Sequence, residues 1–408
     1  MSDLVMLPAI TATAILLFLS LLFWMIYLTK TLFDYKKLPK LQENKLDKNK
    51  EESYPFISIV LPTRNESHRI KGCIESLKKQ TYPNFEVIIV DDSEDNTVEI
   101  IKNIVGNDKR FKIIKENEKH DGWIGKPHAL QQGSREAKGE WLLFIDADVS
   151  FNEKLVENAV QHAVKNSLDM LSVMMSVLCK TFWEKTVQPV PIGLLLFLVP
   201  FSRVNNPENK ASFAAGPFIL IKKRVFNKIG GYEQIKNKIA DDVELAKLVK
   251  ESGFKIGLAH AQHLIKLRMY RNLREIWEGW SKNIFMGSIQ KRGIKSKTLQ
   301  LLLALLGLFA VFDVMVLPFL ATLVFLTLNL LKPSAAWQNL FLLSISVWLL
   351  STFTQFYVHK KYWVGEPRYT PLYFLGGIIT MGILLNSAFK TLTRSEVTWK
   401  GRRYQSET

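Results

Sequence analysis

One acidic pair in this sequence combines a chemically active residue type with a telling spacing. Asp146 and Asp148 directly follow the apolar stretch 141–145, which has the composition of a strand covered on both faces. Side chains two apart in extended chain point to the same side, so the two carboxylates converge just beyond the strand. Two hard oxygen ligands there suit a divalent metal that carries phosphates. A solvated turn, in which Asp is common, is the alternative.

Two further acidic pairs occur in the same half of the chain. Asp91 and Asp92 follow the apolar stretch 85–90. In one parallel sheet this pair and the first would lie at the same edge, where open α/β sheets place their ligands. That coincidence argues against two unrelated turns. Asp241 and Asp242 open a segment with helical spacing, where helix capping is the ordinary alternative.

A lysine lies between the first two pairs. Two glycines, Gly122 and Gly125, precede Lys126, and Pro127 fits the first position of a helix. Backbone amides and a lysine at a helix start form an anion site. A glycine-containing turn with a surface lysine is the alternative. The segment is not a Walker A loop, because the spacing and the Ser/Thr are absent.

The elements that must position these side chains alternate along the chain. Apolar stretches and helical spacing predict strand 56–61, helix 70–79, strand 85–90, helix 98–105, strand 111–114, strand 141–145 and helix 155–164. We expect Pro62 to stop the first strand. Alternation of this kind is the signature of a mainly parallel α/β sheet with right-handed crossovers.

The following segments extend this domain. Residues 170–177 are β-like, 213–221 form a glycine-hinged loop that runs into a strand, and 239–245 open a helix. A helix is also expected over 273–285. The apolar segment 189–204 is punctuated by prolines and too irregular to predict a regular element. Both a position in the membrane interface and a buried hydrophobic loop remain open for it.

The ends of the chain are apolar enough for membrane spans. Residues 4–28 can cross a bilayer, and without a cationic n-region or a cleavage site they predict an anchor. Lysines after residue 29 place the amino terminus outside and the catalytic domain in the cytoplasm of a multi-pass plasma-membrane protein. Residues 299–331, either one tilted helix or a hairpin, and the stretches 337–358 and 371–389 are further spans. Basic segments on both sides of the last span leave its orientation open.

Composition agrees with a membrane protein. The 408 residues carry a formal net charge of +16, and 48% are hydrophobic, concentrated at the two ends, which favours a membrane partner over nucleic acid. The two cysteines show no metal-ligand or disulfide spacing, which favours a reducing compartment. The predicted divisions are an anchor (1–29), a basic linker (30–54), a catalytic domain (55–295), a C-terminal membrane region (296–390) and a basic tail (391–408).

Together the motifs resemble the inverting family 2 glycosyltransferases with the GT-A fold. The resemblance covers about 55–290 and rests, in order, on Pro62–Glu66, Val90–Asp92, Gly125–Lys126, Asp146–Asp148, Gly230–Gly231 and Asp241–Asp242. Further segments look more narrowly like a membrane-anchored subgroup that includes hopanoid-associated and carotenoid-ester glycosyltransferases. These segments are Gly122–Lys126, Arg268–Tyr270, Gly279–Asn283 and Trp399–Tyr404.

The resemblance implies a role for each matched residue. Asp242 would be the general base, and Asp148 would bind Mg²⁺ or Mn²⁺ on the donor diphosphate. The nucleotide-sugar would be held by Thr63, Arg64, Glu66, Asp91, Asp92, Lys126 and Asp146, with Asp92 at the base and Asp146 at the ribose. The acceptor and diphosphate region would include Gly216, Asp241, Arg268, Arg271 and Trp280.

The resulting expectation is a metal-dependent hexosyltransferase that moves a sugar from a UDP-sugar, or a GDP-sugar, to a hydroxyl or carboxyl of a lipid or lipid-linked acceptor. A processive polysaccharide synthase is the alternative, although no Gln-x-x-Arg-Trp motif follows Asp242. An alternative of another class is a nucleotide-binding transporter or sensor, with Asp313 and Asn329 as pathway residues. No nucleic-acid recognition motif appears.

Overall fold

The computed structural model describes residues 2–42, 54–118, 122–238, 240–283, 296–362, 364–393, 397–399 and 402–404. The chain forms two compact units. The sheet unit comprises 36–178 and 199–269, and the helical unit comprises 1–35, 179–198 and 270–408. The predicted catalytic domain, 55–295, therefore loses two segments to the helical unit. Much of the predicted linker and tail lies outside the described residues.

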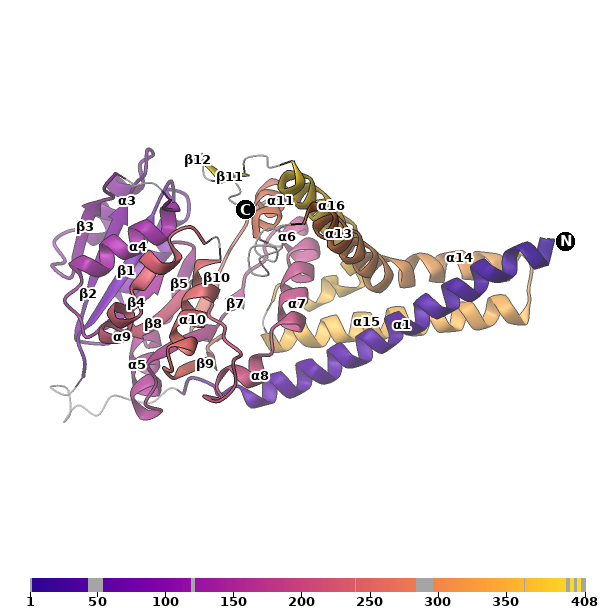
Figure 1. Ribbon diagram of the computed structural model, residues 1–408, viewed down its shortest axis with the longest axis horizontal. Helices are drawn as coiled ribbons and strands as arrows, with labels where there is room; N and C mark the ends of the chain where they lie inside the picture. Colours follow the sequence, from indigo (N-terminus) through magenta and orange to yellow (C-terminus); the bar gives the residue numbers. More distant parts are fainter. Residues whose placement is uncertain are drawn as a thin grey trace. The chain divides into compact units, whose positions relative to one another are not determined.

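The sheet unit is built on a seven-stranded sheet of order β3-β2-β1-β4-β8-β6-β9 (Figure 1). Strands β3, β2, β1 and β4 are parallel, β8 is antiparallel to both of its neighbours, and β6 pairs parallel with β9. Their bounds are β1 Ile57–Thr63, β2 Phe85–Asp91, β3 Phe111–Lys115, β4 Trp141–Ile145, β6 Met170–Met174, β8 Phe218–Lys222 and β9 Ile256–His260. The prediction of a mainly parallel α/β fold is confirmed.

Helices and a small second sheet complete this unit. The helices are α2 Ile70–Lys78, α3 Thr97–Val105, α4 Gly125–Glu136, α5 Leu155–Lys165, α8 Phe201–Val204, α9 Lys223–Lys228 and α10 Asp241–Glu251, with a 3₁₀ helix at Gly231–Ile235. The second sheet has the order β5-β10-β7, with β5 Val149–Phe151, β10 Ile265–Leu267 and β7 Ser176–Val177.

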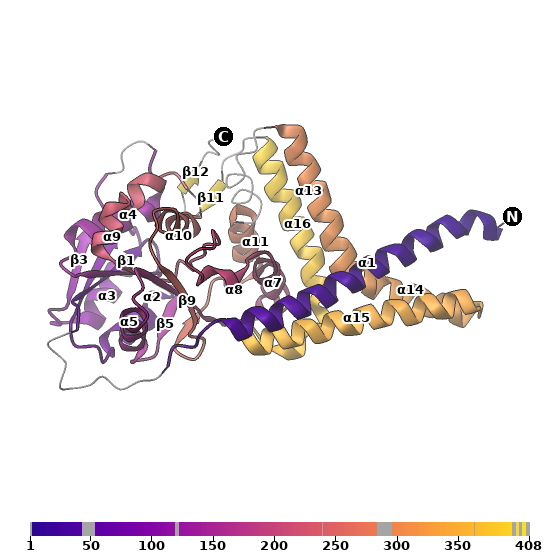
Figure 2. The same ribbon diagram turned by 60° about the horizontal axis from the view of Figure 1, so that its bottom comes forward.

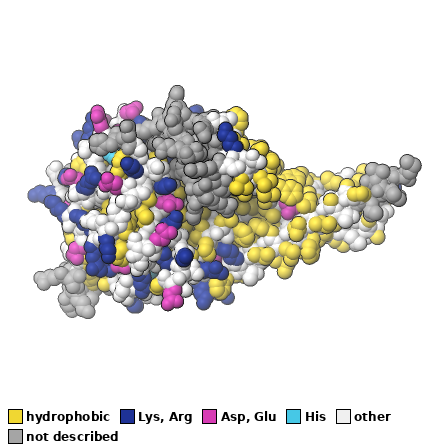
Figure 3. Space-filling model, in the orientation of Figure 1, with side chains coloured by type: hydrophobic (Ala, Val, Ile, Leu, Met, Phe, Trp, Pro, Cys, Tyr) yellow, Lys and Arg dark blue, Asp and Glu magenta, His cyan; other side chains and the backbone are white. Residues whose placement is uncertain are grey.

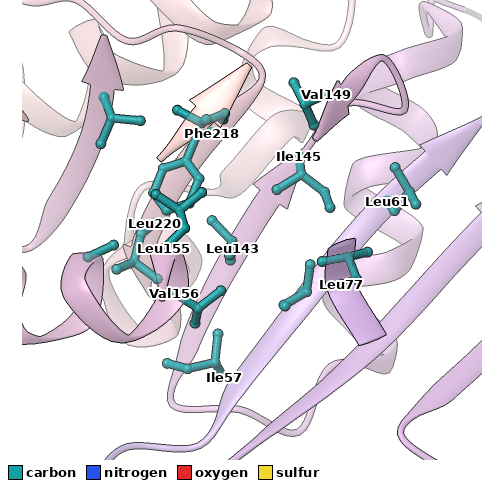
Figure 4. Packing of buried hydrophobic residues seen from close by; sticks show 14 of the residues in the cluster. Ile57, Leu61, Leu77, Leu143, Ile145, Val149, Leu155, Val156, Phe218 and Leu220 are labelled. Carbon is teal, nitrogen blue, oxygen red and sulfur yellow. The ribbon is translucent and has the colours of Figure 1, made fainter. Parts of the chain in front are cut away.

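A continuous apolar core lies between the sheet and its helices. Leu143 and Ile145 of β4 are within 1% of full burial and belong to one cluster with Leu77 of α2 and Val156 of α5 (Figure 4). Burying a side chain of this size contributes about 1.5–3 kcal/mol. The core therefore fixes where β4 ends, and with it the position of Asp146.

Two local predictions about proline were wrong. β1 continues through Pro62, which lies opposite Val90, because β4 pairs with β1 only as far as Val60 and so needs no N–H from Pro62. Pro127 is the third rather than the first residue of α4. An N–H in the first turn of a helix has no intrahelical partner, so proline is tolerated there as well.

The helical unit contains the apolar segments. Its helices are α1 Ser2–Lys37, α6 Phe182–Val187, α7 Pro189–Leu198, α11 Leu273–Ser281, α13 Lys297–Val311, α14 Leu317–Leu331, α15 Ala335–Tyr362 and α16 Tyr373–Leu392. The segment 189–204 is thus helical, as α7 and α8, rather than a loop. In both ribbon views α13 lies beside α16, and α14 lies beside α15 (Figure 2).

Four helical stretches are long and apolar enough to cross a membrane: Pro8–Lys37, Lys297–Leu331, Ala335–Tyr362 and Pro367–Lys390. Their outward side chains are apolar, as the yellow surface of α1, α14 and α15 shows (Figure 3). Leu19, Leu305 and Leu349, for example, are about half exposed. An apolar surface of this extent marks a protein or membrane interaction site, which supports membrane association of this unit.

The stretch 299–331 is a continuous helical path with a π-helical turn at Phe312–Val316, where the sequence left a hairpin open. The turn precedes Pro318, which has no N–H to donate to the carbonyl of Val314. The indole Nε1 of Trp24 donates to that carbonyl instead, at 3.0 Å. A side chain of α1 thus donates to a carbonyl that Pro318 cannot serve, in an apolar setting.

Candidate active site

The carboxyl ends of β1, β2 and β4 meet at one edge of the sheet. Thr63 ends β1 opposite Asp91, which ends β2, and Asp146 follows β4 on the other side of β1. The prediction that the acidic pairs share an edge is confirmed. The hydroxyl of Thr63 donates to Asp91 Oδ1 at 2.6 Å. The Ser93 hydroxyl and N–H also donate to the buried Asp91 carboxylate, which therefore ties the two loops together.

A second ion pair organises the outer part of this edge. Arg64 donates through Nη1 to Asp92 Oδ2 at 2.8 Å and to the Asp92 carbonyl at the same distance, and through Nη2 to Glu94. Asp92 remains about a quarter exposed. Glu66 is buried and pairs with Arg69 at 3.1 Å. Of the predicted nucleotide contacts, Asp92 is thus partly exposed to solvent, whereas Glu66 is buried and stabilises the loop that follows β1.

Lys126 is the centre of the inner part of the site. Its Nζ lies 2.7 Å from Asp146 Oδ1. A Cβ added to Gly216 would lie 3.0 Å from Lys126 Nζ and 3.1 Å from Asp242 Oδ2. The lysine and the carboxylate of Asp242 are therefore both close to this glycine. The N–H of Gly216 donates to Asp242 Oδ2, and that of Val243 to Asp242 Oδ1, both at 2.8 Å. The site therefore joins α4, β4, α10 and the segment before β8.

The charged groups at this centre shift one another's pKa values. Burial raises the pKa of Asp242, and the Lys126 ammonium and the two backbone N–H donors offset part of that increase. Burial alone would lower the pKa of Lys126, but the carboxylates of Asp146, Asp241 and Asp242 outweigh it and hold the lysine protonated. One permanent cation thus lies among three carboxyl groups.

Asp148 lies on the short connection between β4 and β5. Its carbonyl accepts the N–H of Arg268 at 3.1 Å, because β5 pairs antiparallel with β10. Among the described residues no group of three His, Cys, Asp or Glu side chains could hold a metal. The carboxylate oxygens of Asp146 and Asp148 still fit Mg²⁺ or Mn²⁺, since proteins commonly hold such ions with one or two carboxylates while substrate phosphates and waters complete the coordination.

Two predicted residues belong to the helical unit and not to this cluster. Trp280 of α11 is buried, and its Nε1 donates to Gln188 Oε1 at 2.6 Å. The N–H of Arg271 donates to Glu275 Oε2 at 3.1 Å. These contacts stabilise the segment before and within α11. A role for either residue toward the acceptor stays a prediction.

Some residues near the site were not predicted. Cys73 is buried, and its pKa is raised by burial and by the charges of Asp148, Asp146 and Glu66, which places it close to the acidic edge. Tyr232 is also buried close to the carboxylates. The glycine pair before Tyr232 was the available signal, because Gly230 and Gly231 both adopt positive φ, which favours glycine.

Comparisons with known proteins agree with this fold. A mannosyltransferase from Pyrobaculum calidifontis, solved in complex with GDP-Man and Mn²⁺, superimposes with a TM-score of 0.52 over 94% of this chain and 99% of that chain, at 17% identity. The fold is thus that of the GT-A glycosyltransferases. Residues 58–230 match the family described as glycosyl transferase family 2, so the chain carries a glycosyltransferase domain of that family.

Curated relatives extend the similarity beyond this domain. A 4,4'-diaponeurosporenoate glycosyltransferase of Staphylococcus aureus (strain USA300) is 25% identical over 362 residues, which cover 86% of this chain and 89% of the relative. The protein of the same name from Staphylococcus haemolyticus (strain JCSC1435) is 25% identical over 246 residues, or 59% of this chain and 64% of the relative. The predictions of a glycosyltransferase and of its fold are confirmed.

Proposed function

We propose that this protein is a membrane-bound inverting glycosyltransferase that transfers a sugar from a nucleoside diphosphate sugar to the hydroxyl or carboxyl of an apolar lipid. A UDP-sugar is the proposed donor, with a GDP-sugar as the alternative. The observation that carries the proposal is the position of Lys126 between the carboxylates of Asp146 and Asp242. The acceptor class rests on the name of the staphylococcal relatives, which specifies the carotenoid-related 4,4'-diaponeurosporenoate.

The donor would bind along the carboxyl edge of the sheet. Asp92 and Arg64, partly exposed at the outer end, would contact the base, and Asp146 would contact the ribose. The Lys126 ammonium would offset the negative charge that develops on the diphosphate as it leaves. When bound, Mg²⁺ or Mn²⁺ would supply further positive charge at the diphosphate, and Asp148 is the residue proposed to hold it.

The transfer itself needs one displacement. The acceptor oxygen forms a bond to the anomeric carbon while the bond from that carbon to the diphosphate breaks, and a single displacement inverts the configuration. A hydroxyl acceptor must also lose its proton, which Asp242 would take. A carboxylate acceptor is already deprotonated near neutral pH, so its transfer would need no base. Burial raises the pKa of Asp242, which makes it a stronger base than an ordinary aspartate.

The test is an in vitro transfer assay. Membranes that contain the protein are incubated with radiolabelled UDP-glucose, UDP-N-acetylglucosamine and GDP-mannose, and labelled lipids are identified by mass spectrometry. We expect one donor to label one apolar lipid with a single sugar. Products with several sugars per lipid would favour the polysaccharide synthase. No labelled product from any donor, in membranes that bind nucleotide, would favour the binding protein.

A further inference from the structure

One deeply buried polar group near the site belongs to Tyr232. The side chain is completely buried. Its ring packs edge-on against Phe144, with centroids 5.2 Å apart, and lies tilted against Phe226, with centroids 5.6 Å apart. Among the residues that the structure describes, the Tyr232 hydroxyl has no hydrogen-bond partner. Buried hydroxyls are nearly always hydrogen-bonded, so such a group calls for a partner that arrives later.

The position of Tyr232 is fixed by the elements that build the site. Its backbone N–H donates at 2.8 Å to the side-chain oxygen of Gln131, which lies in α4 together with Lys126. Phe144, against which the ring packs, precedes Asp146 by two residues in β4. A Cβ on Gly231 would lie 2.7 Å from both Gln131 and Phe226, so only glycine allows this approach. The ring is therefore held rigidly.

The charges around the Tyr232 hydroxyl indicate which kind of ligand group could accept its hydrogen bond. The charges of Asp241, Asp242 and Asp146 all act on the Tyr232 phenol and, after burial, are the causes that raise its pKa. The phenol is thus neutral and remains a hydrogen-bond donor. Unlike Lys126, the phenol has no positive charge that would attract the diphosphate towards these carboxylates. A neutral sugar hydroxyl is not repelled by them.

We propose that the Tyr232 hydroxyl donates a hydrogen bond to one hydroxyl of the transferred sugar and thereby helps to select the donor. The inference rests on the proposed function, since it assigns a group of the same donor. Tyr232 is a specificity-determining residue in this scheme and takes no proton. Sites built to hydrogen-bond a substrate hydroxyl discriminate against analogues that lack it, because the buried protein group is then left unpaired.

The experiment compares Tyr232→Phe with the wild type by titration of the purified full-length protein in detergent. The ligands are UDP, the labelling sugar nucleotide from the transfer assay and its monodeoxy sugar analogues, one for each free hydroxyl of the sugar. If no donor is turned over, UDP-glucose and its analogues are used. We expect Tyr232→Phe to bind UDP like the wild type but to bind the intact donor about fivefold more weakly. For one deoxy analogue the two proteins should bind equally, because the partner hydroxyl is already absent.

Tyr82→Phe is the matched control. Tyr82 is as deeply buried in the same unit, but its hydroxyl donates to the Pro55 carbonyl at 2.6 Å, away from the site. It should leave all donor affinities unchanged. Equal donor affinity in Tyr232→Phe and wild type would overturn the proposal, as would an equal loss for UDP and for every analogue. Absence of transfer by the wild type would refute the proposed function instead, and the binding comparison would still decide the role of Tyr232.

Discussion

Replacing Asp242 with Asn separates the charge of this side chain from its shape. The amide oxygen can still accept the Val243 N–H, whereas the amide nitrogen cannot accept the N–H of Gly216, which now donates at 2.8 Å. Lys126 keeps its contact with Asp146 at 2.7 Å. We therefore expect the variant to fold and to bind the donor nucleotide, but without a group that takes a proton.

The magnitude follows from these contacts. A positioned general base contributes about 10²–10⁴-fold to a rate, or roughly 2.7–5.5 kcal/mol of transition-state stabilisation. The lost hydrogen bond from Gly216 to a charged oxygen adds about 1.5–3 kcal/mol to the cost of positioning the side chain. With a hydroxyl acceptor, kcat should therefore fall by at least about 10²-fold. With a carboxylate acceptor, the proton-transfer part of the loss should be absent.

The assay measures transfer from labelled donor to two long-chain acceptors that differ only in a terminal alcohol or acid. Nucleotide affinity is measured by titration on the same preparations. Asp169→Asn is the control. Asp169 pairs with Lys222 at 2.9 Å and, in the described residues, makes no contact with Lys126, Asp146 or Asp242. Near-normal turnover of the alcohol by Asp242→Asn would refute the assignment of the base. Loss of nucleotide binding would show that the variant disturbs the donor site.

Three further predictions concern metal, charge and the membrane helices. Asp148→Ala should weaken nucleotide binding about tenfold or more in Mg²⁺ or Mn²⁺ but leave binding in EDTA unchanged; an equal loss in both would exclude a metal-dependent role. Activity that needs ionised Asp242 should fall as the pH drops through the raised pKa of this residue. Lys126→Met should move this acidic fall in the pH–activity profile to higher pH, because the ammonium that offsets the effect of burial is gone. An unchanged profile would contradict the influence of Lys126 on the pKa of Asp242. Trp24→Phe should lower the free energy of unfolding in detergent by about 1–3 kcal/mol, since the Val314 carbonyl loses the indole donor. Trp183→Phe is the control and should leave it unchanged, because Trp183 is partly exposed. An equal loss of stability in both variants would refute the role of the Trp24 indole.

The sequence was sufficient for the parallel part of the sheet and for its acidic edge. Strands such as 85–90 and 141–145 are buried on both faces, so an uninterrupted apolar run identifies them. The acids that follow then lie at one edge, because parallel strands share their carboxyl ends. Pro62 misled the prediction, since sequence shows a missing N–H but not which side of the strand needs one.

The centre of the site could not be derived in this way. Gly216 and Asp242 are 26 residues apart, and their contact depends on where α10 begins relative to the loop before β8. In the sequence Tyr232 looks like an ordinary core aromatic residue. A role for its hydroxyl can be inferred only from neighbouring carboxylates on other elements, which the sequence does not place. The sequence also did not predict the helices in the segment 189–204. Its prolines at 189 and 191 fall in the first turn of α7, where they do not break a helix.

The hydrogen bond from Trp24 to Val314 sets an order of events during synthesis. The two residues are 290 positions apart in the chain, and the whole sheet unit lies between them. At a translation rate of about 5–20 residues per second, the indole waits roughly 15–60 s before its partner leaves the ribosome. Before then α1 can already contact an earlier part of its own unit, since the Tyr27 hydroxyl donates to the Gly193 carbonyl at 2.8 Å. The contact with Val314 therefore forms late, after the whole sheet unit has been synthesised.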